Sequence, residues 1–297
     1  MHNRIINLSL LMLSTIQKKF GTDFFVINKL FSGGNSEVYI VKDTSSKRYA
    51  LKLFKQRRYD SKLINEIEKG ILLNSKGGEH FSFIKYISSE SERLTKRTFI
   101  IYELAEKNTL KKLLINGKYF DENHALVIFS VVAKEVNELH KMGLAHMNIK
   151  LENILVDGDY NLKLAGFSQA QKVEKSDNNE EQNELYLDDI FRLGILLLKL
   201  ITGKCDIKSL EKLLKVIQKG RYESFWKAIE IQNNRKFSVK LKELINILLT
   251  IKSNKDHKKW TLDEILNNKD WFNDIQMIKA NANIYMKEKF EEVDGLD

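Results

Sequence analysis

The sequence predicts an α+β fold, with a small strand-rich N-terminal part followed by a larger helical part. Up to Glu103, short runs of apolar and β-branched residues alternate with turn residues, and from Asn108 onward apolar residues recur at helical spacing. The chain has 297 residues, of which 43% are hydrophobic and 30% charged. This composition is typical of a soluble globular protein with a sizeable core.

Five strands and one helix are predicted in the first part. The strands are Phe24–Leu30, Glu37–Val41, Tyr49–Phe54, Phe83–Ile87 and Thr98–Glu103. Two glycines stand in the first turn, and a polar segment, Ser88–Arg97, joins the last two strands. Between the third and fourth strands, apolar residues at helical spacing predict the helix: Leu63, Ile64, Ile67, Ile71 and Leu72.

The second part reads as helices. Asp121 is placed to cap a helix with an apolar face that runs from Leu126 to Leu139. Residues Ile190–Ile201 are apolar on every side, which predicts a helix buried in the core and ended by Gly203. The remaining segments, through Leu241–Ile251 and Trp260–Phe272, are also predicted to be helical.

Composition excludes several classes of function. The net charge is +9, but the lysines are spread along the chain, so we expect no nucleic-acid partner. Cys205 is the only cysteine, which excludes a disulfide framework and favours a reducing, cytoplasmic location. The apolar stretch Ile5–Ile16 is too short to span a bilayer and lacks a cleavage pattern, so we expect no membrane anchor.

Glycines and charged residues of the first part of the chain are candidates for a binding site. Gly33 and Gly34 lie in the first turn, and Lys52 follows Tyr49-Ala50-Leu51 on the third strand. Glu68 lies on the first helix, with Glu66 as a competing position. Each alone has an ordinary explanation, a hairpin turn or a surface charge.

A longer motif gives these candidates a specific meaning. Residues 144–155, Leu-Ala-His-Met-Asn-Ile-Lys-Leu-Glu-Asn-Ile-Leu, align without a gap to the catalytic loop of protein kinases. Gly166-Phe167-Ser168 stands where that family has Asp-Phe-Gly, and Asp189 begins the buried helix. The chain over about residues 23–275 therefore resembles a Ser/Thr protein kinase, and its tail resembles the calmodulin-dependent type.

The resemblance implies a two-lobed kinase fold. We expect an N-terminal extension (1–22), a kinase-like domain (23–275, with an N-lobe 23–103 and a C-lobe 106–275) and a C-terminal tail (276–297). It implies that Lys52 and its glutamate partner face the phosphates of a nucleotide, beneath the glycine turn. Adenine-facing positions are then Val38, Ala50 and Leu155, with the backbone of Glu103 and Ala105. His146, Phe167, Leu72 and Tyr86 match the four stacked core side chains of active kinases.

Three positions depart from the family's chemistry. Asn148 replaces the aspartate that accepts the substrate proton, and an amide is not basic near neutral pH. Gly166 replaces the aspartate that holds magnesium, which leaves Asn153 as one neutral ligand for a hard dication. Met147 replaces the arginine that reads an activating phosphate. The catalytic positions Asn148, Lys150 and Gly166 are thus degenerate.

The substrate-binding segment also departs from the family. Twenty-two residues separate Gly166 from Asp189, and the chain contains no proline with which to form an Ala-Pro-Glu motif. Lys259 stands where the family has the arginine that pairs with that motif. The resemblance therefore predicts a pseudokinase that binds a protein partner, such as an active kinase, with at most weak, magnesium-independent ATP binding. The alternative is a weakly active, atypical Ser/Thr kinase that uses Lys150 and Asn153.

Overall fold

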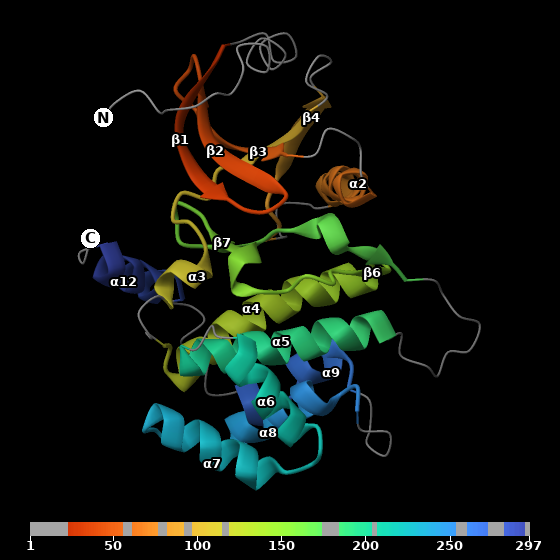
Figure 1. Ribbon diagram of the computed structural model, residues 1–297, viewed down its shortest axis with the longest axis vertical. Coiled ribbons are helices and arrows are strands. Elements are labelled where there is room, and N and C mark those ends of the chain that lie inside the picture. The colour runs from red at the N-terminus through yellow and green to blue at the C-terminus, as the bar shows by residue number, and fades with distance from the viewer. Residues whose placement is uncertain are drawn as a thin grey trace. The chain divides into compact units, whose positions relative to one another are not determined.

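The computed structural model describes residues 23–55, 61–76, 82–91, 97–114, 119–173, 184–203, 207–253, 260–272 and 282–294 (Figure 1). The described residues fall into two units, one that ends at Glu106 and one that starts at Lys107. The expected extension 1–22 and the position Lys259 lie outside the described residues. We describe each unit by itself.

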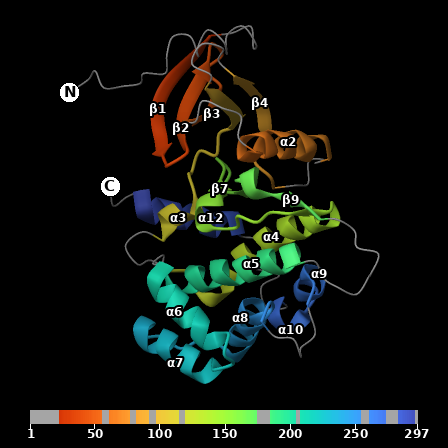
Figure 2. The same cartoon turned by 45° about the vertical axis from the view of Figure 1, so that its right-hand side comes forward.

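The described residues of unit 1 form an antiparallel sheet and one helix (Figure 2). The strands, in the spatial order β1-β2-β3-β5-β4, are β1 (Phe24–Ser32), β2 (Ser36–Asp43), β3 (Arg48–Phe54), β5 (Thr98–Glu103) and β4 (Tyr86–Ser91), and the helix is α2 (Ser61–Lys76). Inward-facing side chains on alternate positions of the strands form its core, with Val41, Leu51 and Ile101 fully buried. The predicted first, second, third and fifth strands are confirmed.

The fourth strand differs from the prediction. It was expected at Phe83–Ile87, but β4 covers Tyr86–Ser91 and pairs with β5 so that Ser89 lies opposite Ile100. The expectation followed apolar residues, whereas a ladder is made by backbone groups and accepts serine on a half-exposed strand. Phe83 and Ile84 are buried outside the strand.

Unit 2 is mainly helical. Its helices are α3 (Leu110–Leu113), α4 (Glu122–Lys141), α5 (Glu184–Thr202), α6 (Ile207–Ile217), α7 (Tyr222–Asn233), α8 (Val239–Thr250), α9 (Leu262–Leu266), α10 (Lys269–Phe272) and α12 (Ala282–Asp294), with the short 3-10 turns η2 (Leu151–Asn153) and η3 (Phe167–Gln169). Two short strand pairs join β6 (Leu144–Ala145) to β9 (Gln171–Lys172) and β7 (Ile154–Val156) to β8 (Leu162–Leu164). Together with the sheet of unit 1, this confirms the predicted two-lobed α+β fold class.

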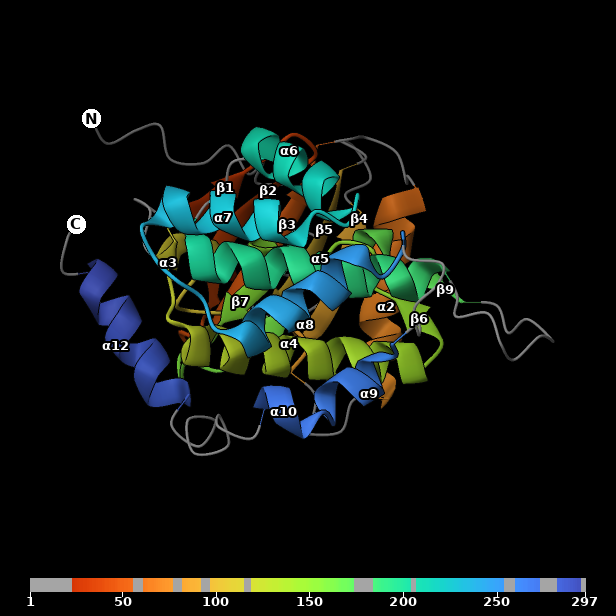
Figure 3. The ribbon, with the colours of Figure 1, turned by 90° about the horizontal axis from the view of Figure 1, so that it is seen from below.

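Helix α5 is the centre of unit 2 and packs against both α4 and α8. Seen from below, α8 runs beside α5 (Figure 3). Most side chains of the predicted apolar run Ile190–Ile201 are buried, and Phe191, Arg192, Ile195 and Lys199 are half-buried. Asp121 caps α4 as predicted, because its carboxylate accepts a hydrogen bond from the backbone N–H of His124 at 3.2 Å. Gly203 follows the end of α5 in a left-handed conformation.

The C-terminal helix α12 packs on α3 and α4. Met286 and Phe290 are buried in this contact, and the ring of Tyr285 stacks on His124. The side chain of Asn283 donates to Asn161 in the β7–β8 turn at 2.8 Å. The sequence had left open whether this segment docks on the domain, and the structure places it against unit 2.

Candidate functional site

In unit 1, Lys52 on β3 pairs with Glu66 on α2. The ammonium group donates to both carboxylate oxygens, at 2.6 and 2.8 Å. Glu66 is only 3% exposed, and Oε1 also accepts a hydrogen bond from the hydroxyl of Tyr102 at 2.9 Å. A lysine held in this way presents a fixed cation on the central strand of the sheet.

Glu68 was predicted as the partner of Lys52, and this prediction is wrong. Glu68 is exposed, because two residues along an α-helix turn a side chain by about 200°. Leu63, Glu66 and Gly70 share the buried face at spacings of three and four residues. The competing position, Glu66, is the one that faces the sheet.

The prediction of Leu72 as a member of the four-residue core stack is wrong by the same two positions along α2. Leu72 is half-buried, while Gly70, four residues after Glu66, lies against Tyr86. A Cβ atom on Gly70 would stand 2.9 Å from Cβ and Cδ2 of Tyr86. A large ring on β4 thus fills the space that a side chain on α2 would take.

This close contact predicts an unusual sign for Gly70→Ala. In an exposed helix the change would add about 1 kcal/mol of stability through helix propensity. Here crowding of the Tyr86 ring costs about 1–3 kcal/mol, so we expect a net loss of about 1 kcal/mol in the free energy of unfolding. Urea denaturation of Gly70→Ala in the wild-type and Tyr86→Leu backgrounds checks this. A stabilised Gly70→Ala in the wild-type background would contradict it.

The glycine turn of unit 1 is tied to the following strands. The backbone N–H of Gly33 donates to the carbonyl of Ser36 at 2.9 Å, and Lys55 Nζ donates to the carbonyl of Gly33 at 2.5 Å. Gly34 has open space around its Cα. Lys52 lies opposite Val38 in the strand register, so the turn and the lysine stand at the same end of the sheet.

The remaining adenine-facing positions are divided between the units. Val38, Ala50, Glu103 and Ala105 belong to unit 1, where all four are half-buried. The backbone N–H of Glu103 donates to the carbonyl of Lys85 at 3.0 Å. Leu155 lies on β7 of unit 2 and is half-buried as well.

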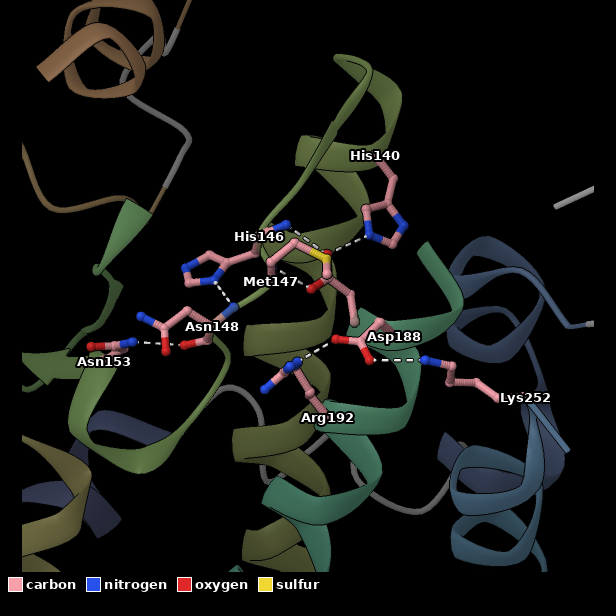
Figure 4. Close-up of polar contacts among 9 residues, drawn as sticks. His140, His146, Met147, Asn148, Asn153, Asp188, Arg192 and Lys252 are labelled. Atoms are coloured by element: carbon pink, nitrogen blue, oxygen red, sulfur yellow. Dashed lines mark hydrogen bonds and ion pairs between the residues drawn. The ribbon is translucent and has the colours of Figure 1, made fainter. Parts of the chain in front are cut away.

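In unit 2, Asp189 in the second turn of α5 holds the loop that carries the catalytic positions. Figure 4 labels three residues of this loop, His146, Met147 and Asn148. The carboxylate of Asp189 is fully buried and accepts hydrogen bonds from the backbone N–H groups of His146 at 2.7 Å and Met147 at 2.8 Å. His140 Nε2 lies 3.0 Å from the same carboxylate. Met147 has φ +61°, a left-handed conformation that costs about 1–2 kcal/mol for such a residue and is held by these bonds.

His146 has a defined tautomer. Nδ1 accepts from the backbone N–H of Asn148 at 3.2 Å, so Nε2 carries the proton and donates to the carbonyl of Ala165 at 3.1 Å. Burial lowers the pKa of His146, which keeps the ring neutral. The ring lies 5.1 Å from that of Phe167, so this half of the predicted stack is present in unit 2.

Two of the positions predicted as degenerate, Asn148 and Gly166, lie together with Asn153. Asn153 Nδ2 donates to the carbonyl of Asn148 at 2.6 Å, as Figure 4 shows, and Asn148 Nδ2 lies 3.3 Å from the carbonyl of Gly166. A Cβ atom on Gly166 would stand 2.5 Å from Cγ of Asn153. The amide of Asn153 thus fills the space that a side chain at 166 would need. Lys150 is exposed at the rim of η2.

This set of groups does not fit magnesium. Mg²⁺ requires hard oxygen ligands, usually carboxylates, in near-octahedral geometry. Asn148 and Asn153 supply neutral amides that are bonded to backbone carbonyls, and Gly166 supplies no side chain. Of the nearby carboxylates, Glu152 pairs with Lys111 at 2.9 Å, and Asp157 accepts backbone bonds from Asp159 and Asn161 within the β7–β8 turn. Among the described residues, no group of three or more acidic, histidine or cysteine side chains could hold a metal ion.

The segment before α5 is shorter than the sequence predicts. Residues 184–188 were expected in the substrate-binding segment but form the start of α5. Tyr186 stacks on His140 and donates its hydroxyl to that residue's backbone carbonyl at 2.9 Å. Burial would raise the pKa of Asp188, but its hydrogen bonds with Arg192 and Lys252 outweigh burial and lower the pKa. Residues 174–183 lie outside the described residues.

Two functional features escaped the sequence analysis. Tyr102, the last residue but one of β5, was not singled out, although a hydroxyl in an apolar run is a signal for a buried hydrogen bond. The second feature is the pair of ion pairs made by Asp188. Arg192 lies within α5, and Lys252, at 3.1 Å, follows α8 and so joins the two segments. Arg192 is four residues from Asp188, so that pair could have been found from its spacing.

Comparisons with known proteins agree with this geometry. The family model of the protein kinase domain matches residues 24–187, more than half of the chain. Sperm motility kinase 1 of Mus musculus is 25% identical over 252 residues, which cover 78% of this chain and 49% of that protein. Sperm motility kinase 2A of the same species is 25% identical over 253 residues, covering 78% and 47%.

A fungal protein is similar over a shorter stretch. Probable serine/threonine-protein kinase KCC4 of Saccharomyces cerevisiae is 26% identical over 173 residues, which cover 52% of this chain and 16% of that protein. This chain spans about half the length of the mouse proteins that it matches. Among the described helices, none is long and apolar enough to cross a membrane.

Proposed function

This chain belongs to the protein kinase family, whose domain implies ATP binding, and we propose that it is a pseudokinase that acts by binding a protein partner. One observation carries the proposal. The amide of Asn153 occupies the space beside Gly166, where a side chain would otherwise hold a metal ion against the phosphates. An active kinase as the partner is the first class to test.

The loss at Asn148 supports the proposal from the side of the substrate. Its amide can position a hydroxyl group but cannot take the proton, and general-base help is worth about 10²–10⁴ in rate. Its Nδ2 already faces the carbonyl of Gly166. The losses at Asn148 and Gly166 affect different parts of the transition state, so they act together.

What remains fits binding better than chemistry. Lys52 is held by a buried glutamate, and His146 and Phe167 keep their ring contact in the interior of unit 2. We propose that ATP binds weakly through Lys52 and the backbone of the glycine turn, without a metal contribution. The segment between Phe167 and α5 is shorter than the sequence predicts, because 184–188 are part of α5, and this supports a loss of peptide binding.

We expect no phosphate incorporation into generic protein substrates at rates near those of ordinary kinases, about 1 s⁻¹ or faster. ATP should raise the melting temperature by the same small amount with magnesium and with a chelator, because Gly166 has no side chain with which to bind the metal. Radiolabel transfer and thermal-shift titrations measure both. Lys52→Ala should abolish the shift, and Lys42→Ala, an exposed lysine on the same sheet, should preserve it. A large magnesium-specific shift, or rapid transfer, would favour the weakly active kinase instead.

A further inference from the structure

Tyr102 is a buried tyrosine whose hydroxyl needs an explanation. It lies on β5 between Ala50 of β3 and Tyr86 of β4, and is 9% exposed. Its ring meets that of Tyr86 edge-on, at 6.2 Å between centroids and 80° between planes. Phenylalanine would supply the same ring contact, and burying a hydroxyl without a partner costs stability. The hydroxyl is therefore there for its hydrogen bond.

The partner of this hydroxyl is the glutamate of α2. Tyr102 donates to Glu66 Oε1 at 2.9 Å, the same oxygen that lies 2.6 Å from Lys52 Nζ. Burial and the neighbouring Glu66 carboxylate raise the pKa of Tyr102 well above its usual value, so the hydroxyl stays protonated and donates. A hydrogen bond to a charged acceptor is worth about 1.5–3 kcal/mol.

Glu66 thus ties three elements at one carboxylate. Lys52 comes from β3, Tyr102 from β5 and Glu66 from α2. The lysine is a long, flexible group that is 21% exposed, whereas the tyrosine is rigid and enclosed. Further along α2, Gly70 lies against the Tyr86 ring and the Asn74 amide donates to the Tyr86 carbonyl. These contacts within unit 1 hold α2 in one position without a bound molecule.

We propose that Tyr102 is a positioning residue whose hydroxyl latches Glu66, so that α2 keeps Glu66 on Lys52 in the absence of a nucleotide. The conformation of α2 is then set by the core of unit 1, and a nucleotide adds little to it. This proposal deepens the proposed function. Only the part of the experiment that adds ATP depends on the proposed function. A partner would meet the same α2 surface whether ATP is present or absent.

Hydrogen exchange of the α2 amides tests the latch, with Tyr102→Phe compared against Tyr86→Phe in the full chain. Tyr86 is the matched control because its hydroxyl bonds to Ser89 of its own strand, at 2.8 Å. In Tyr102→Phe we expect α2 exchange to become about tenfold faster or more, the equivalent of a lost bond to a charged group. In Tyr86→Phe the α2 amides should exchange at the wild-type rate. Amides of α4 in unit 2 should be unchanged in both, which separates local opening from global destabilisation.

ATP supplies the second arm. In the wild type, α2 exchange should change less than twofold on addition of ATP, whereas in Tyr102→Phe the nucleotide should restore part of the lost protection. Wild-type α2 amides that become protected only with ATP would overturn the proposal, and so would equal α2 exchange in the two tyrosine variants.

A double-mutant cycle keeps the test valid if one variant folds poorly. Glu66→Gln keeps the side-chain shape and removes the charge, so it should open α2 at least as much as Tyr102→Phe. Adding Tyr102→Phe to Glu66→Gln should then have little further effect, because the charged acceptor is already gone. Fully additive effects would show that the hydroxyl acts elsewhere. Phosphoryl transfer by the wild type would defeat the proposed function without changing any of these exchange rates.

Discussion

Restoring both aspartates, by Asn148→Asp with Gly166→Asp, is expected to leave peptide phosphorylation at least about 10²-fold below that of ordinary kinases. The two aspartates do not restore the positioning of the substrate hydroxyl, and positioning alone can be worth about 7–11 kcal/mol of the barrier. The position of Gly166 gives a steric reason. Its φ is +87°, and a new Cβ would meet the Asn153 side chain at 2.5–2.6 Å. An aspartate there must displace Asn153 and break its bond to the Asn148 carbonyl. Assays of labelled phosphate transfer to peptides measure the result.

A steric control separates crowding from charge. Gly166→Ala adds only the Cβ atom and should lower the free energy of unfolding by about 1–3 kcal/mol, with part of the loss recovered in Gly166→Ala/Asn153→Ala. The double revertant should bind magnesium–ATP more tightly than the wild type, because it gains a carboxylate ligand. Robust peptide phosphorylation by the double revertant would show that the segment before α5 is adequate and that Asn153 moves easily.

Asp189→Asn is expected to be the most destabilising polar substitution in unit 2, at about 3–5 kcal/mol. Each carboxylate oxygen of Asp189 accepts a backbone N–H group, from His146 and from Met147. An amide has one oxygen, so its NH₂ group would face one of these donors in a fully buried site. The left-handed conformation of Met147 would lose its support at the same time. Urea denaturation followed by tryptophan fluorescence measures the loss.

The neighbouring residue provides the control. Asp188→Asn makes the same chemical change one position earlier, but its partners Arg192 and Lys252 are 38% and 40% exposed. We expect a loss of about 1 kcal/mol or less, as for pairs that water can reach. Equal losses in the two variants would mean that the Asp189 carboxylate does not organise the catalytic loop.

The fold was predictable where local pattern and tertiary contact agree. Strands β1, β2, β3 and β5 were found because their apolar, β-branched and aromatic residues form short runs that turn or polar residues separate. The fourth strand was displaced because its pairing with β5 uses serine backbone groups, which carry no hydrophobic signal. Helix α5 was found but begins earlier than expected, since the acidic pair Asp188 and Asp189 separates its first turn from the continuous apolar run.

The site was predictable only in part, for a related reason. The partner of Lys52 depends on which face of α2 meets the sheet, and both Glu66 and Glu68 were compatible with the apolar pattern of the helix. The tight contact of Gly70 with Tyr86 decides that face, and it joins residues far apart in the chain. For the same reason, Leu72 was predicted to contact Tyr86, whereas Gly70 makes this contact.

The sequence by itself determined which chemical groups stand at the reaction positions. An amide at Asn148 has no basic site and Gly166 has no ligand, whatever surrounds them, because these properties belong to the residue types. Only the tertiary structure decided what takes the vacated space. The Asn153 side chain lies beside Gly166, the Tyr102 hydroxyl donates a hydrogen bond to Glu66, and α12 packs on α3 and α4. Such contacts follow from close packing between distant segments, and local periodicity carries no record of them.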